Sequence, residues 1–131
     1  MRTLILVTTI SLAWTVQVLA EDVVNGQALF RLSCSACHGL GAAGDGPMAG
    51  VLVVKPRNLT RLAADNGGAF PAERIAARID GRDPLVSNGS PMPVYGYFFE
   101  GPGATLEGSD GPVRTTQPVA DIIAWLRTVQ E

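Results

Sequence analysis

Five consecutive residues, Cys34-Ser35-Ala36-Cys37-His38, constrain this chain more than any other part of its sequence. The two cysteines are the only ones in the chain, and His38 is its only histidine. On a helical backbone, residues three apart lie on one face, so both thiols can reach neighbouring edges of a flat ring while the imidazole emerges beside it. This C-x-x-C-H spacing is typical of thiols that add to the vinyl groups of haem, with the imidazole on the iron. The motif predicts one covalently attached haem c, held by Cys34 and Cys37 and ligated by His38.

Three other uses of the cysteines compete with haem attachment. A disulfide between them would close a ring too small to add much stability, and it would leave His38 without a role. A thioredoxin-like redox pair should follow a strand in a β-α-β pattern, whereas this pair follows a predicted helix and precedes a glycine-rich loop. A structural zinc site needs four ligands, and the chain offers two cysteines and one histidine. Haem attachment remains the favoured hypothesis.

The length and the start of the chain indicate one exported domain. The chain has 131 residues, about the length of a single domain, and it contains no internal repeat. Residues 1–20 have the pattern of an export signal, with Arg2 as a basic start, an apolar stretch, and the small residues Val18 and Ala20 before the cleavage site. We therefore expect a signal peptide over 1–20, a mature domain over 21–131 and a periplasmic location. An uncleaved signal would act as a membrane anchor, although the stretch is shorter than the ~20 apolar residues that a span needs.

The charge balance bears on possible partners. Without the signal, the chain keeps nine Lys and Arg residues against twelve Asp and Glu residues, a net charge of −3. Nucleic-acid binding is disfavoured, because that function usually shows a concentrated basic stripe. Lys55 is the only lysine, so any positive contact surface must consist of arginine, which binds carboxylates through two parallel hydrogen bonds.

The spacing of apolar residues predicts a domain made of helices and loops. Helical spacing is clearest over 118–130, and it also runs through 23–32 into the motif. Capping residues predict two short helices over 59–65 and 71–79. Residues 82–117 are rich in Gly and Pro, and so long a loop in a small domain suggests that it wraps a cofactor. Because no hairpin pattern is apparent, we expect an all-α domain with little or no sheet.

Three segments in the same order give the sequence a resemblance to the class I c-type cytochromes: residues 34–38, Gly46-Pro47 and Met92-Pro93. The resemblance covers essentially the whole mature chain. It is greatest to the bacterial single-haem members, through Gly44-Asp45-Gly46-Pro47, Pro56-Arg57-Asn58-Leu59-Thr60, Asp80-Gly81-Arg82 and Met92-Pro93-Val94-Tyr95-Gly96. It implies a small cytochrome c fold, all-α, with about four to five short helices and long loops wrapped around one haem. It also implies that the terminal helices cross tightly, with Gly26 and Phe30 meeting Trp125.

The second iron ligand must come from a residue other than histidine, and methionine is the natural candidate. Met1 leaves with the signal, and Met48 follows His38 by ten residues in a loop expected on the same face of the haem. Met92 remains, and a proline on each side stiffens its backbone. We predict that His38 and Met92 ligate the iron, as is usual for electron-transfer haems. The alternative is that Met92 fills core space, as most methionines do.

Further residues are assigned roles around the haem. The resemblance implies that the ring N–H of His38 donates to the carbonyl of Pro47, which would fix the orientation of the imidazole. Arg57 and Arg61 are candidates for binding the haem propionates, because arginine fits carboxylates, although exposed arginine is also common on a solvated face. The role of residues 98–116 is left open between a plain surface connection and a docking face.

Taken together, these features predict an electron carrier and no enzyme. We expect it to accept one electron from a redox protein donor and give it to a redox protein acceptor, with no small-molecule substrate. The alternative is a haem-bearing electron-transfer subunit of a larger dehydrogenase or reductase complex. A haem enzyme or gas sensor would need an open iron position, which Met92 would close.

Overall fold

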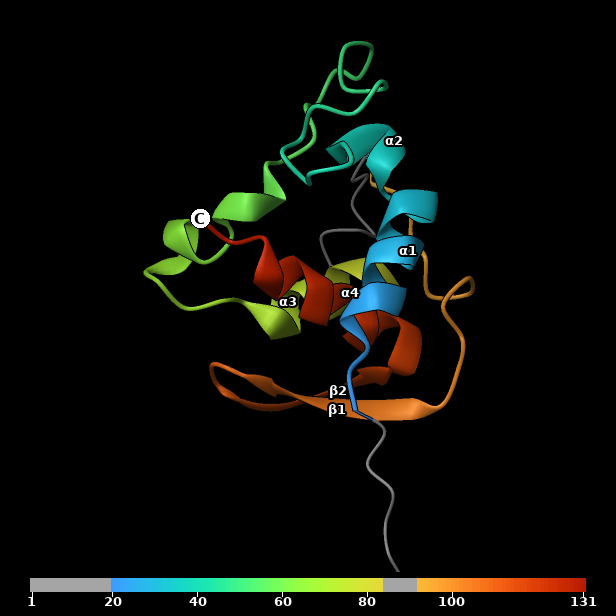
Figure 1. Cartoon of the computed structure of the whole chain (residues 1–131), viewed down its shortest axis with the longest axis vertical. Coiled ribbons are helices and arrows are strands. Elements are labelled where there is room, and N and C mark those ends of the chain that lie inside the picture. The colour runs from blue at the N-terminus through green and yellow to red at the C-terminus, as the bar shows by residue number, and fades with distance from the viewer. Residues whose placement is uncertain (1–19, 84–91) are drawn as a thin grey trace, which may run out of the picture.

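Two helices from opposite ends of the sequence cross at the centre of the molecule. The structure is a computed structural model that describes residues 20–83 and 92–131. Helix α1 (Val23–Ser33) begins after Asp22, whose side chain accepts a hydrogen bond from the Asn25 amide at 2.9 Å. Helix α4 (Gln117–Thr128) has a proline in its first turn, where no N–H is needed. Figure 1 shows the two helices packed across each other, and both lie where the apolar spacing predicts them.

The close crossing of α1 and α4 depends on a glycine. A Cβ atom on Gly26 would lie 1.9 Å from the carbonyl oxygen of Asp121, so only a residue without a side chain lets the two backbones come this close. One turn further along α1, the ring of Phe30 packs on that of Trp125 with the centroids 4.4 Å apart. The tight crossing is confirmed, and Gly26 comes nearest to α4 at Asp121 and Ile122.

A buried carboxylate joins the same two helices. The side chain of Asp121 is 2% exposed, and it accepts hydrogen bonds from the Asp22 backbone amide at 2.9 Å and from the Asn25 side-chain amide at 2.7 Å. A third bond comes from the Gln117 side chain at 2.7 Å. These donors offset the cost of burying a carboxylate. Sequence reasoning missed Asp121, because a single acid within an apolar helix gives no signal until its partners are known.

Helix α3 (Ala72–Asp80) forms one further wall of the core. It follows Pro71 and ends at Gly81, which adopts the left-handed conformation with φ of 85°, close to the predicted bounds. Its buried face consists of Ala72, Ala76 and Ile79. Across residues 20–83 and 92–131, no helix combines the length and the apolar composition needed to cross a membrane.

The helix expected over 59–65 is wrong, because the structure has two 3₁₀ turns there instead. These are η1 (Leu59–Arg61) and η2 (Ala64–Asn66). In an α-helix the Ala63 amide would donate to the carbonyl of residue 59, but here it donates to the Gln130 side-chain oxygen at 3.0 Å. The side-chain nitrogen of Gln130 in turn donates to that carbonyl at 2.8 Å. One side chain from the C-terminus thus replaces the bond that would have continued the helix.

The expectation of an all-α domain with little or no sheet holds only in part, because the described residues include one small sheet. Strands β1 (Gly103–Gly108) and β2 (Gly111–Thr116) pair antiparallel, with Gly108 opposite Gly111 beside a two-residue turn. Leu106 and Val113 lie opposite each other, and both are buried in the core. Most of the loop expected over 98–116 is therefore a hairpin that packs against the helices.

The described residues form a mainly helical fold with one small sheet. Figure 1 shows the hairpin at one end of the molecule, beside α4, with the chain entering α1 at the same end. The short helix α2 (Ser35–His38) and the glycine-rich loop that follows it lie at the opposite end. Residues of the C-x-x-C-H motif are thereby placed far from the hairpin.

Candidate functional site

The C-x-x-C-H residues lie at the junction of α1 and α2. Cys34 connects the two helices, since its amide donates to the Phe30 carbonyl at 2.8 Å and its carbonyl accepts from the His38 amide at 2.9 Å. Both cysteines are half-buried, and both line one cavity together with His38. Thiols and imidazole therefore face a common space, as the helical spacing predicts.

The loop after the motif is hydrogen-bonded to the main chain of α2. The Gly46 amide donates to the Cys37 carbonyl at 3.1 Å, and the Met48 amide donates to the Ala36 carbonyl at 2.9 Å. A Cβ atom on Gly46 would lie 2.5 Å from two carbonyl oxygens of α2, so the close packing of this loop requires glycine. These contacts fix the motif against the cavity.

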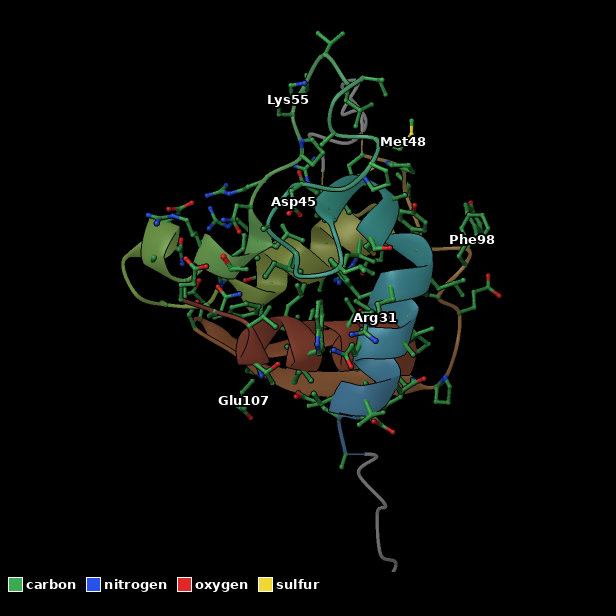
Figure 2. The ribbon with its side chains drawn as sticks, turned by 45° about the horizontal axis from the view of Figure 1, so that its top comes forward. Arg31, Asp45, Met48, Lys55, Phe98 and Glu107 are labelled. Carbon is green, nitrogen blue, oxygen red and sulfur yellow. The ribbon has the colours of Figure 1, made fainter. Side chains whose placement is uncertain are left out.

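The outer part of this loop projects beside the cavity. Val51 and Val53 are both exposed, the second of them to 99%. The Lys55 ammonium donates to the Ala49 carbonyl at 2.9 Å and to the Gly50 carbonyl at 3.3 Å, which closes the loop on itself. Lys55 also lines the cavity that Cys34, Cys37 and His38 share. Figure 2 shows it at the end of the molecule opposite Glu107.

A mainly apolar cleft opens beside the motif. It consists of two adjoining cavities of about 220 and 340 Å³, which share four wall residues: Cys34, His38, Arg78 and Met92. The larger cavity reaches the central helices, and its apolar lining includes Phe30, Leu59, Leu62, Ile75, Ile79, Ile122 and Leu126. A cleft of this size and composition suits a cofactor or a small molecule.

The structure separates the two candidate methionines. Met92 lines both cavities, together with the C-x-x-C-H residues. Met48 is 45% exposed and projects away from the ribbon in Figure 2, outside the described lining of either cavity. Of the prolines beside Met92, Pro93 lines the smaller cavity and Pro91 lies outside the described residues.

The imidazole of His38 is oriented by a main-chain carbonyl, but not by the expected one. Its Nδ1 lies 3.0 Å from the carbonyl oxygen of Arg57, so the bond implied to Pro47 is wrong. The reason is the path of the loop: a Cβ atom on Gly44 would lie 2.6 Å from the Pro56 carbonyl oxygen, so the two segments pass each other closely. Because a carbonyl only accepts, Nδ1 carries the hydrogen and Nε2 keeps its lone pair.

Burial sets the protonation of Cys34 and His38. Desolvation, together with the neighbouring Cys37, raises the pKa of the Cys34 thiol to about 11. Burial lowers the pKa of His38, against the opposing effect of its bond to Arg57. At neutral pH, Cys34 is an uncharged thiol and His38 an uncharged imidazole. These forms suit a thioether and a metal ligand, whereas a reactive cysteine needs a thiolate.

Arginine side chains line the cleft, and only one of the two predicted arginines is among them. Arg57 lines the larger cavity while its guanidinium pairs with Asp65 at 2.9 Å, so its contact with a propionate stays a prediction. Arg61 pairs with Asp65 at 3.7 Å and is not among the described wall residues. Sequence reasoning missed Arg74 and Arg78, which line the larger cavity from α3. Their spacing of four residues on a predicted helix was the available signal.

The geometry fits haem better than the competing hypotheses. Both cysteines are free thiols, and they follow α1 rather than a strand. In the part of the chain that the structure describes, no three His, Cys, Asp or Glu side chains are grouped to hold a metal ion. An apolar cleft whose walls carry two thiols, one imidazole lone pair and one thioether suits a flat ring with an iron atom at its centre.

Comparison with known proteins agrees with this geometry. A family model described as Cytochrome c matches residues 23–130, which include the motif, both crossing helices and the hairpin. No curated protein and no solved structure matches the chain. The family implies a haem c cofactor and electron transfer through it. The match covers most of the sequence, and the chain therefore belongs to the cytochrome c family.

Proposed function

We propose that this protein is a periplasmic carrier with one haem, attached covalently through Cys34 and Cys37, that moves single electrons between two redox proteins. The observation that carries the proposal is that His38 and Met92 line the same apolar cleft from separate segments of the chain. With Nε2 of His38 and the sulfur of Met92 as its ligands, the iron would have no open position for a substrate. When bound, the haem supplies the Fe(III)/Fe(II) couple.

The contribution of the chain is to hold the ligands still and keep water away. The Arg57 carbonyl fixes the imidazole, and the backbone bonds of Gly46 and Met48 fix α2 behind it. Apolar side chains of α1, α3 and α4 cover the inner part of the cleft. Ligands that stay in place between the two oxidation states keep the structural change on electron transfer small.

Export is proposed from the sequence of residues 1–20, of which 1–19 lie outside the described residues. A basic start, an apolar stretch and small residues before Glu21 support cleavage there. The mature domain would then span 21–131, and a membrane would be involved only if the signal stayed in place. Both electron partners are expected to be proteins, and nucleic acid is not expected to bind.

The test compares two methionine variants of the haem-loaded protein. The oxidised wild type should show the weak near-infrared sulfur-to-iron band, and its reduced form should take up carbon monoxide very slowly at neutral pH. Met92→Ala should abolish the band and make carbon monoxide binding rapid, because it opens the sixth position of the iron. Met48→Ala is the matched control and should change neither property. Rapid binding by the wild type would contradict the carrier, and loss of the band in Met48→Ala would contradict the ligand assignment.

The second candidate is a permanently docked electron-transfer subunit of a larger complex. Tyr97 and Phe98, between Met92 and the hairpin, are both largely exposed, and Figure 2 shows Phe98 pointing away from the body of the molecule. Neighbouring exposed aromatic side chains are typical of protein interfaces. Sedimentation of the haem protein in a fresh periplasmic extract, compared with the purified chain, distinguishes a free carrier from a subunit.

A further inference from the structure

The side chain of Tyr95 connects the segment that carries Met92 to the end of α1. We propose that Tyr95 is a positioning residue, whose hydroxyl holds the Met92 segment against the motif wall and so keeps the methionine sulfur within reach of the iron. The proposal rests on the Met92 ligation proposed above and adds the residue that maintains it.

The hydroxyl makes a direct link between the two walls of the cleft. It donates to the Ser33 carbonyl at 2.9 Å, across 62 positions of the sequence. Ser33 is the last residue of α1 and directly precedes Cys34. The last carbonyls of a helix lack intrahelical partners, so the hydroxyl fills a position that the helix leaves open. Tyr95 also lines the smaller cavity together with Cys34 and Met92.

Packing fixes the direction of the Tyr95 ring. It stacks on Phe99 with the centroids 5.7 Å apart and an interplanar angle of 29°, and Phe99 itself is buried. The ring of Phe98 lies 5.8 Å from it at a steeper angle. A ring held in this way cannot turn its hydroxyl far without disturbing the core.

Met92 is close to Tyr95 along the chain, so the restraint on Tyr95 also limits the position of Met92. Tyr95 follows Met92 by three residues, which span at most about 10 Å even when extended. Pro93 stiffens the connection between them. The backbone at Tyr95 is also anchored, since its amide donates to the Ile79 carbonyl at 2.9 Å at the end of α3. Release of the hydroxyl should therefore loosen the Met92 segment from α1 and let the Tyr95 amide bond to α3 open more often.

The first experiment measures how often the Met92 sulfur leaves the iron. In the reduced, haem-loaded protein, the rate of carbon monoxide uptake at a fixed saturating concentration reports this opening. Tyr95→Phe removes only the hydroxyl, and it should raise the rate roughly 2- to 10-fold, the change expected from loss of one side-chain hydrogen bond. Tyr97→Phe removes the same atom from a residue that is 87% exposed, and its rate should equal that of the wild type.

A second measurement excludes a merely structural role. Asn25→Ala removes the bond to Asp121 at the far end of α1, so it should lower the urea midpoint without raising the carbon monoxide rate. Backbone amide exchange of Tyr95 and Phe99 in the haem-loaded protein should quicken in Tyr95→Phe and stay unchanged in Asn25→Ala. This exchange does not depend on which side chain ligates the iron.

The outcomes separate the two proposals. An unchanged carbon monoxide rate in Tyr95→Phe overturns the positioning role, whether or not its amide exchange quickens. An equal rise in Asn25→Ala overturns it as well, because the effect would then be general destabilisation. Failure of the ligand assignment appears elsewhere, as a sulfur band that persists in Met92→Ala.

Discussion

At the scale of single residues, the site combines a motif that is local in the sequence with contacts between distant segments of the chain. Cys34, Cys37 and His38 are assigned from their spacing alone, and the family match agrees with a haem c cofactor. Their attachment to the haem and its iron stays a prediction. The carbonyl that orients His38 could not be predicted, because it depends on how the loop after the motif passes the segment that contains Arg57. Asp121 shows the same limit, since its donors come from α1 as well as from its own helix.

The attachment of haem gives a prediction at this scale. After extraction with acidified acetone, the colour of the wild type should stay with the polypeptide, because thioether bonds survive this treatment. The Cys34→Ala, Cys37→Ala double variant, supplied with haem, should lose essentially all of its colour to the solvent. Absorbance of the two phases measures the result, and Ser35→Ala is the control within the same motif. Colour that leaves the wild-type chain would contradict covalent attachment.

At the scale of elements, helices with a strong apolar face were predictable and elements defined by their partners were not. The hairpin was not predicted, because Leu106 and Val113 are its only buried residues. The alternation of apolar and polar residues is therefore too short to detect among glycines and prolines. The turn residues Ser109 and Asp110 between two glycines were the available signal. The prediction of a helix over 59–65 was wrong for a similar reason. Gln130, from a distant part of the chain, takes the place of the main-chain bond between residues 59 and 63.

The crossing of α1 and α4 gives a prediction at this scale. Gly26→Ala should lower the free energy of unfolding by about 1–3 kcal/mol or more, because its Cβ would meet a main-chain oxygen that cannot move aside. This cost exceeds the helix propensity of up to ~1 kcal/mol that alanine gains over glycine. Urea unfolding followed by circular dichroism measures the difference. Gly41→Ala, where a new Cβ meets nothing within 4 Å, is the control, and equal midpoints for both variants would disprove the argument.

At the scale of the whole molecule, the apolar side chains form two regions. One is the packed core around the crossing of α1 and α4, and the other is the wall of the cleft that the haem would fill. The largest fully buried side chains lie on α1 and α4, at or near their crossing. Two of these side chains, Phe30 and Ile122, also line the cleft, together with Ile79 and Leu126. The resemblance was enough to anticipate the mainly helical fold around such a cleft, whereas the sheet packed beside α4 was not foreseen.

This division predicts how the chain behaves without its cofactor. The Cys34→Ala, Cys37→Ala double variant without haem should be largely disordered, because water would then reach apolar walls that both central helices share with the core. Circular dichroism during heating should show a shallow, non-cooperative change, in contrast to the sharp transition of the haem-loaded wild type. A cooperative transition in the haem-free variant would show that the chain folds by itself.

The position of Lys55 has a practical consequence for electrochemistry. It is the only lysine and it lines the smaller cavity. Figure 2 shows it at the end of the molecule away from the start of α1. A mature chain that begins at Glu21 would therefore carry two primary amines, one at each end. Coupling through Lys55 on an electrode would turn the cleft toward the metal surface, whereas Lys55→Arg would leave the terminal amine and turn the cleft away. The interfacial electron-transfer rates of the two layers would then show directly which end of the molecule conducts.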